Sequence, residues 1–227
     1  MNTFFLDRLN SEPHALAFAG QSTPWPVALA DQSANPALDE ALHTHAAAAQ
    51  ALLYPVSAEL LATTGRPVDL FGFEPNPARL GAAAAASASV PGIALTQLGA
   101  LLDAAALGYN PAQAKPVAVL GHSQGVLAVH MVQAICEAGS IDAAAAKIDE
   151  ILAIATLIGV AGTRQARQLG LAARHGEATP MLSVKDIPRA QVDALIERVD
   201  GARGPIAVAV TNSATHYVLS GHPEDLA

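Results

Sequence analysis

The junction of an apolar strand, a glycine-flanked turn and an apolar helix is the feature that most constrains how this chain folds. The β-branched run 116–120 predicts a strand, and the run 126–138, apolar on nearly every side, predicts a buried helix. In the turn between them, Gly121 and Gly125 flank Ser123. A strand of this kind is typical of a parallel sheet and is then buried on both faces. We therefore predict an α/β fold with a parallel sheet.

The composition supports a sizeable core and excludes several classes of protein. Of the 227 residues, 52% are hydrophobic but only 4% are aromatic, which predicts helices packed closely through small side chains. The net charge of −8 provides no basic stripe to neutralise phosphates, so we expect neither nucleic acid nor an anionic membrane as a partner. The single cysteine, Cys136, excludes a disulfide framework and is expected in the core of its helix.

The sequence also indicates a compartment. Residues 1–8 carry charges where a signal peptide needs an apolar stretch. The longest apolar run, 151–162, is too short to span a bilayer. We therefore expect a cytoplasmic protein.

The first part of the chain is predicted to be mostly helical. Val90 and Pro91 predict the start of a helix, because proline fits the first helical turn. The alanine–serine tract 81–89 before them is compatible either with a helix or with a flexible spacer. The other predicted elements of this part are helices at 3–11, 31–61 and 142–168, a strand at 15–19 and a proline-rich loop at 67–77.

A second domain is predicted towards the end of the chain, where the pattern becomes β-α-β-β. The predicted elements are strands at 179–184, 205–210 and 217–220 and an amphipathic helix at 189–199. Such an order is the first part of a ferredoxin-like unit. We therefore divide the chain into a core, residues 1–172, and the start of a ferredoxin-like subdomain, residues 173–227. Pro223 and the acids after it predict the first turn of another helix, so we expect a fragment of a longer polypeptide.

Ser123 is the predicted nucleophile of an acyl-transfer site. A serine between a strand and a helix has its hydroxyl at a helix N-terminus, and glycines on either side make room for the strained turn. The backbone N–H of Gln124 can then donate to an oxyanion forming on a bound acyl carbonyl. The alternative is a glycine-rich turn with an inert serine. His122 is adjacent in sequence and is expected to pack in the turn rather than act as the base.

Two other groups of residues are assigned no chemistry. His43 and His45 do not share a helix face, so we expect both at the surface and predict no metal site. Trp25 is expected to pack in the core or at the rim of a pocket.

The residues resemble the acyltransferase family that includes malonyl-CoA:acyl-carrier-protein transacylases and the acyltransferase domains of fatty acid and polyketide synthases. Residues 17–21 are similar to its first strand and Gly-Gln loop, 121–125 to its nucleophile motif, and 212–213 with 218–221 to a hairpin of its small subdomain. The detail is most similar to the N-terminal acetyltransferase domain of actinobacterial type I fatty acid synthases. The sequence segments with counterparts in that domain are 72–75, 89–92, 121–129 and 157–163.

This resemblance implies an α/β-hydrolase-like core with an inserted ferredoxin-like subdomain. It also implies that Ser123 takes an acyl group from coenzyme A and passes it to the phosphopantetheine thiol of an acyl carrier domain, priming fatty acid synthesis in a homo-oligomeric multienzyme. A coenzyme A thioester is then the substrate, and no bound cofactor is expected. Gln21 would support the oxyanion beside the Gln124 N–H, and substrate contacts are expected from His122, Ile158 and Asn212.

One departure from the family pattern concerns the acyl group. Malonyl-specific members have an arginine that grips the free carboxylate, and the matching position here is Ile158. Arg164 and Arg167 follow it by about 240° and 180° around a helix and should point elsewhere. Because a carboxylate buried without a partner is costly, we expect a neutral acyl group, in particular acetyl.

A second departure concerns the catalytic base. None of the histidines after Ser123 matches the position of the family's catalytic histidine, so we expect the base beyond residue 227. The histidines considered are His130, His175, His216 and His222.

Two other readings stay open. A serine hydrolase or thioesterase of the α/β-hydrolase type would have the same turn, but it needs a downstream acid and histidine. The candidates are Asp186 or Asp200 with His216 or His222, and no His-Gly-Gly-Gly loop is present. The other reading is a non-catalytic segment that helps to assemble a multienzyme.

Overall fold

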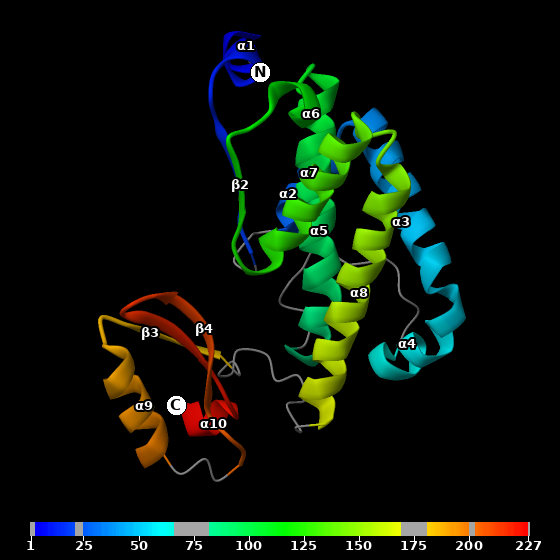
Figure 1. Cartoon of the computed structure of the whole chain (residues 1–227). Helices are drawn as coiled ribbons and strands as arrows, with labels where there is room; N and C mark the ends of the chain where they lie inside the picture. The colour runs from blue at the N-terminus through cyan, green and yellow to red at the C-terminus, as the bar shows by residue number, and fades with distance from the viewer. Residues whose placement is uncertain (1–2, 21–24, 66–81, 169–180, 200–202, 227) are drawn as a thin grey trace. The chain divides into compact units, whose positions relative to one another are not determined.

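The computed structural model describes residues 3–20, 25–65, 82–168, 181–199 and 203–226 (Figure 1). The chain divides into two compact units, Met1–Gln165 and Ala166–Ala227, and each is described by itself. The predicted boundary after residue 172 and the predicted loop at 67–77 lie outside the described residues.

The first unit combines two strands with a set of packed helices. In chain order its elements are α1 (Thr3–Ser11), β1 (Ala15–Phe18), α2 (Trp25–Ser33), α3 (Pro36–Leu53), the 3-10 helix η1 (Tyr54–Val56), α4 (Ser57–Thr64), α5 (Ala82–Ala106), α6 (Pro111–Ala114), β2 (Ala118–Gly121), the 3-10 helix η3 (Ser123–Gly125), α7 (Val126–Ala138) and α8 (Ala145–Gln168). The predicted strand at 15–19 and the predicted helices at 3–11 and 126–138 are therefore confirmed.

The two strands pair in parallel, as predicted. Ala15 lies opposite Ala118, and Phe18 lies opposite Gly121. The predicted burial of β2 on both faces is wrong, because Leu120 is 60% exposed and Val117, just before the strand, is 71% exposed. Within the described residues β2 pairs only with β1, so its remaining edge and outer face are not covered. The fold is thus mixed α/β with a two-stranded parallel sheet.

Helix α5 crosses the centre of the first unit and begins earlier than predicted. It runs without a break through Pro91, so the predicted start at 90–91 is wrong and the alanine–serine tract is helical from Ala82. Alanine has the highest helix propensity, which favours extending the helix even where Pro91 removes one hydrogen bond. Gly92 follows the proline and lies directly under the ring of Trp25, which is buried in the core.

The segment Ala86–Ala106 of α5 is long and apolar enough to cross a membrane by length and composition alone. In this unit, 67% of its most apolar window is buried against other elements, as in the core helix of a globular domain.

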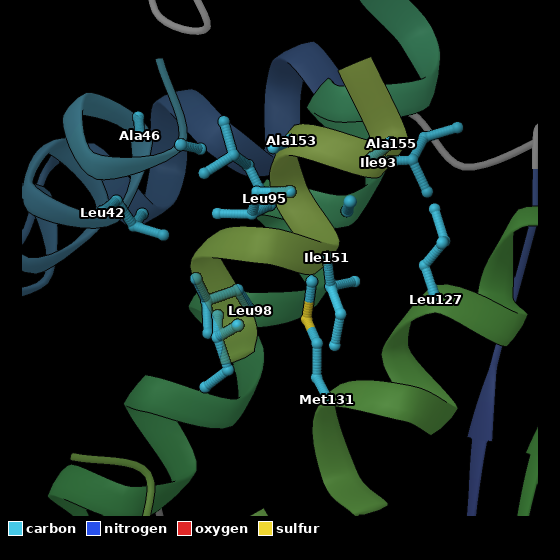
Figure 2. Close-up of a cluster of buried hydrophobic side chains, with 14 of the residues drawn as sticks. Leu42, Ala46, Ile93, Leu95, Leu98, Leu127, Met131, Ile151, Ala153 and Ala155 are labelled. Carbon is cyan, nitrogen blue, oxygen red and sulfur yellow. The ribbon is translucent and has the colours of Figure 1, made fainter. Parts of the chain in front are cut away.

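The core of the first unit is built where α3, α5, α7 and α8 meet, and small side chains let these helices approach closely (Figure 2). At one such point a Cβ on Gly159 of α8 would lie 2.5 Å from the backbone oxygen of Ala86 in α5. This agrees with the close packing through small residues that the composition predicts. Residues of this cluster labelled in Figure 2 are Leu42, Ala46, Ile93, Leu95, Leu98, Leu127, Met131, Ile151, Ala153 and Ala155.

Two side chains of these helices lie differently from the predictions. Cys136 is exposed rather than in the core, because α7 buries the face that carries Met131 and Ile135. His45 is not at the surface: its Nδ1 lies 2.6 Å from Oδ1 of Asp149 on α8, and the two side chains are only 12% and 15% exposed. The partner is 104 residues away in the sequence, so no local pattern indicates it.

The second unit is a three-stranded antiparallel sheet with helices. Its elements are β3 (Met181–Lys185), α9 (Arg189–Arg198), β4 (Ala207–Ser213), β5 (His216–Ser220) and α10 (Pro223–Leu226). The strand order is β3-β5-β4, and a small core forms around Val192, Tyr217 and Leu219. The predicted β-α-β-β order is confirmed. Three strands do not distinguish a ferredoxin-like unit from other folds of this order, so that assignment stays a prediction.

Replacing Leu98 by alanine tests the core of the first unit. Leu98 is completely buried, and the truncation leaves a cavity, so we expect a loss of about 2–5 kcal/mol in the free energy of unfolding. The matched control is Leu52→Ala, because Leu52 is 52% exposed and should change stability by less than about 0.5 kcal/mol. Urea denaturation followed by circular dichroism measures both, and equal losses would contradict the described core.

Candidate active site

Ser123 lies at the turn between β2 and α7 in a backbone conformation that few residues adopt. Its φ is +53°, in the left-handed region, and the residue is exposed. For a residue with a side chain this conformation costs about 1–3 kcal/mol and persists only where the surroundings enforce it. Such a sharp strand-to-helix turn presents a serine hydroxyl at the N-terminus of a helix, as the sequence predicts.

Glycines at three positions allow the turn to close. A Cβ on Gly121 would lie 2.5 Å from the backbone of Gly125, and a Cβ on Gly125 would overlap the carbonyl oxygen of Phe18. Gly20, after β1, is packed against the same turn: a Cβ there would lie 2.7 Å from the His122 oxygen and 2.8 Å from Cβ of Ser123. The turn and the end of β1 therefore touch backbone to backbone.

Backbone hydrogen bonds hold the turn and leave one donor open. The N–H of His122 donates to the Phe18 carbonyl over 3.0 Å, and the N–H of Gly125 donates to the His122 carbonyl over 2.9 Å. The N–H of Gln124 has no acceptor among the described residues. An unused N–H at a helix N-terminus beside a serine hydroxyl is suited to binding a developing oxyanion. Gln21, the other predicted oxyanion residue, lies outside the described residues.

Gln97 of α5 also reaches this region, and sequence reasoning missed it. Its Nε2 donates to the carbonyl oxygen of Ala19, over 2.6 Å, just before Gly20. The residue is 7% exposed. The signal that could have found it is a lone amide inside an otherwise apolar helix, which needs a partner when it is buried.

Ile158, the predicted acyl-contact residue, lies on α8 and is 50% exposed. Its neighbours Ile154 and Leu157 are exposed to a similar extent, as is Val126 at the start of α7. Arg164 points elsewhere, as predicted: it pairs with Glu59 of α4 over 3.0 Å.

A groove of about 410 Å³ runs between α7 and α8 and is mainly apolar. It begins at Val126, three residues after Ser123, and His130 and Ile154 lie along it. The exposed apolar side chains around Ile158 thus continue a hollowed surface that starts next to the turn.

The candidate histidines of the second unit have non-acidic partners. His216 Nε2 lies 3.0 Å from Oγ of Ser183 and 3.4 Å from Nδ2 of Asn212, the third predicted substrate-contact residue. His222 Nδ1 accepts from the N–H of Glu224. Neither ring contacts a described carboxylate, so the Asp–His pair that the hydrolase reading needs is not formed among the described residues. His175 and Asp200 lie outside them.

Cys136 is less suited than an ordinary thiol to act as a competing nucleophile. Partial burial, together with the nearby carboxylate of Glu137, raises the pKa of the thiol. A raised pKa lowers the fraction of reactive thiolate. Within the described ranges, no three His, Cys, Asp or Glu side chains are grouped closely enough to hold a metal ion.

The chain belongs to the family described as the starter unit:ACP transacylase in aflatoxin biosynthesis, which residues 74–227 match. This confirms the resemblance to acyl-carrier-protein transacylases. A fatty acid synthase beta subunit, hexB, of Dothistroma septosporum is 31% identical over 121 residues, which are 48% of this chain and 6% of that protein. The chain therefore spans only a small part of this relative.

A crystal structure of an acyl-carrier-protein S-malonyltransferase from Bartonella henselae is also similar. It has 19% sequence identity and a TM-score of 0.49, and the match covers 94% of this chain and 56% of that one.

Replacing Gly20 by alanine tests the contact between the end of β1 and the turn. The added Cβ would meet the His122 oxygen and Ser123 Cβ, so the turn has to shift, and we expect labelling of Ser123 by a fluorophosphonate probe to slow at least about tenfold. In the control, Gly108→Ala, nothing lies within 4 Å of the new Cβ, although φ is +95°. It should lose some stability but label normally. Equal labelling of the two variants would contradict the described packing.

Proposed function

We propose that this chain transfers a short neutral acyl group, in particular acetyl, from coenzyme A to the phosphopantetheine thiol of an acyl carrier domain. The observation that carries the proposal is the conformation of Ser123: left-handed, exposed, at a helix N-terminus and beside the unused N–H of Gln124. Membership of the starter-unit transacylase family supports acyl transfer to a carrier protein.

The reaction follows the chemistry of an activated serine. Ser123 Oγ attacks the thioester carbonyl while a general base takes its proton, and the oxyanion of the tetrahedral intermediate accepts from the Gln124 N–H. The intermediate collapses with loss of the coenzyme A thiolate, which is protonated, and leaves acyl-Ser123. The carrier thiol then attacks the ester and regenerates the serine. The substrate is the thioester itself, and no resident cofactor takes part in the proposal.

The choice of a neutral acyl group is supported by what lies near Ile158. A malonyl carboxylate placed against Ile158 would lose part of its hydration without gaining a cation, which is unfavourable, whereas a methyl group has no such penalty. The nearest downstream arginine, Arg164, is occupied with Glu59. His122 and Asn212 are proposed as further substrate contacts, and Gln21 as a second support for the oxyanion.

The setting of this reaction is also a proposal. The similarity to a fatty acid synthase beta subunit supports a fatty acid synthase context. Within it we further propose that the chain primes fatty acid synthesis, in the cytoplasm and as part of a homo-oligomer.

Loading with radiolabelled acetyl-CoA and malonyl-CoA tests the acyl preference. We expect acetyl to be attached in preference to malonyl and Ser123→Ala to abolish attachment of both. Ile158→Arg should raise malonyl relative to acetyl loading at least about tenfold, because the guanidinium can grip the carboxylate. Leu52→Arg on α3 is the control: Leu52 is as exposed as Ile158 but lies on another helix and does not line the groove, so the ratio should stay unchanged. Preferential loading of malonyl by the unaltered chain would refute the acetyl proposal.

An ester without a thiol acceptor separates transfer from hydrolysis. With p-nitrophenyl acetate we expect one equivalent of nitrophenol and a stable acyl-Ser123, detected by intact mass. Continuous turnover in the absence of a thiol would favour the hydrolase reading instead.

A further inference from the structure

We propose that Gln97 is a positioning residue for acyl transfer at Ser123. Its side-chain amide fixes the carbonyl of Ala19, and through it the segment that packs against the turn. The inference rests on the proposed function and adds to it a residue that lies on a different helix from the nucleophile.

The position of Gln97 is unusual for an amide. It lies in the most apolar part of α5, where Ile93, Leu95 and Leu98 are completely buried, and is itself only 7% exposed. Its Nε2 donates to the Ala19 oxygen over 2.6 Å, which links α5 to a residue 78 positions earlier in the chain. The other end of the amide, Oε1, is buried without a partner among the described residues.

The buried, half-bonded amide of Gln97 contributes little to stability but is well suited to fixing the position of the Ala19 oxygen. Burying an amide is unfavourable unless its polar atoms are bonded, and only one end of Gln97 is bonded among the described residues. An apolar side chain would fit this stretch of α5 with less desolvation. The amide cannot be turned over either, because Oε1 would then face the Ala19 oxygen, acceptor against acceptor. Gln97 therefore holds the Ala19 carbonyl in one place.

The Ala19 carbonyl belongs to the segment that touches the nucleophile turn. Gly20 follows directly, and its α-carbon is so close to the turn that a Cβ there would lie 2.8 Å from Cβ of Ser123. Moving this backbone inward produces an overlap, and moving it outward removes the contact that supports the left-handed turn. A misplacement of about 1 Å in a catalytic site typically costs about 100-fold in rate. Gln97 therefore acts on the reaction without touching the reacting atoms.

The chain contains a matched control for this contact. Gln32 of α2 also donates from Nε2 to a backbone carbonyl, that of Thr96, over 2.9 Å. Its Oε1 is likewise buried without a partner in the described part of the chain, and its side chain lies against Gly99. The bond has the same chemistry, but it ends on α5 instead of on the segment beside Ser123. Loss of either bond should affect the fold similarly, and only one should affect the site.

The experiment compares Gln97→Met with Gln32→Met in single-turnover acylation by acetyl-CoA. Intact mass of the full polypeptide measures acyl-Ser123 over time at several concentrations of acetyl-CoA. We expect Gln97→Met to slow the limiting rate about 10–100-fold, with the half-saturating concentration unchanged, because the turn that carries Ser123 is misplaced while no contact with acetyl-CoA is removed. Gln32→Met should stay within about twofold of the unaltered chain. Thermal unfolding of both variants measures whether their stabilities are comparable, as we expect.

Equal rates for the two variants, whether both normal or both slow, would overturn the inference. If Gln97→Met does not fold, Gln97→Glu replaces it, because a carboxylate keeps the shape but cannot donate to the Ala19 oxygen. Its acylation rate relative to the unaltered chain at the same pH should be low when the carboxylate is ionised and should recover as the pH is lowered and the acid is protonated. Absence of this recovery would also overturn the inference.

The proposed function and this inference fail in different ways. If the unaltered chain forms no acyl-Ser123 from any acyl-CoA, the proposed function fails. A fluorophosphonate still compares Gln97→Met with Gln32→Met in that case, because attack by Ser123 places negative charge on the phosphoryl oxygen of the probe before fluoride leaves. Unequal labelling would then support the positioning role without acyl transfer, and equal labelling would refute it.

Discussion

The left-handed backbone of Ser123 is the constraint on which the first unit depends. A residue with a side chain holds this conformation only if its surroundings enforce it, and here contacts with the end of β1 and within the turn do so together. The end of β1 packs against the turn, the carbonyl of Phe18 accepts from His122, and Gly125 leaves no room between them. The parallel pairing of β1 with β2 brings these segments together. The sheet is small, but its strand pairing fixes the position of the turn relative to the end of β1.

Two helices of the first unit also contact or begin at this turn region. Helix α5 supplies the core and, through Gln97, a polar contact to the segment after β1. Helix α7 starts at the turn, so the open N–H of Gln124 and the groove beside Val126 both lie at the N-terminal end of this helix. The proposed nucleophile, the proposed oxyanion donor and an apolar surface then lie at one junction, a combination suited to transfer of a small acyl group.

Local patterns predicted the parts of this molecule that local forces determine. Strand–turn–helix at Ser123, the helix at 126–138 and the β-α-β-β order follow from periodicity and glycine spacing, and the structure has all three. The start of α5 was a local error, since the helix begins at Ala82 and runs through Pro91. The other discrepancies concern contacts between distant segments. The pairing of His45 with Asp149 and the bond from Gln97 to Ala19 join residues 104 and 78 positions apart, which no window of sequence contains. The exposure of β2 likewise depends on which strands lie beside it.

The contact between α5 and α8 has a consequence for how such a chain can change during evolution. A side chain on Gly159 would collide with the backbone of Ala86, whereas Ile158, immediately before it, is half exposed. Gly159 allows the two helices to approach closely, and the preceding residue, Ile158, faces the surface where we propose the acyl group binds. Selection for a different acyl group could therefore act on one codon while the helix crossing beside it stays unchanged.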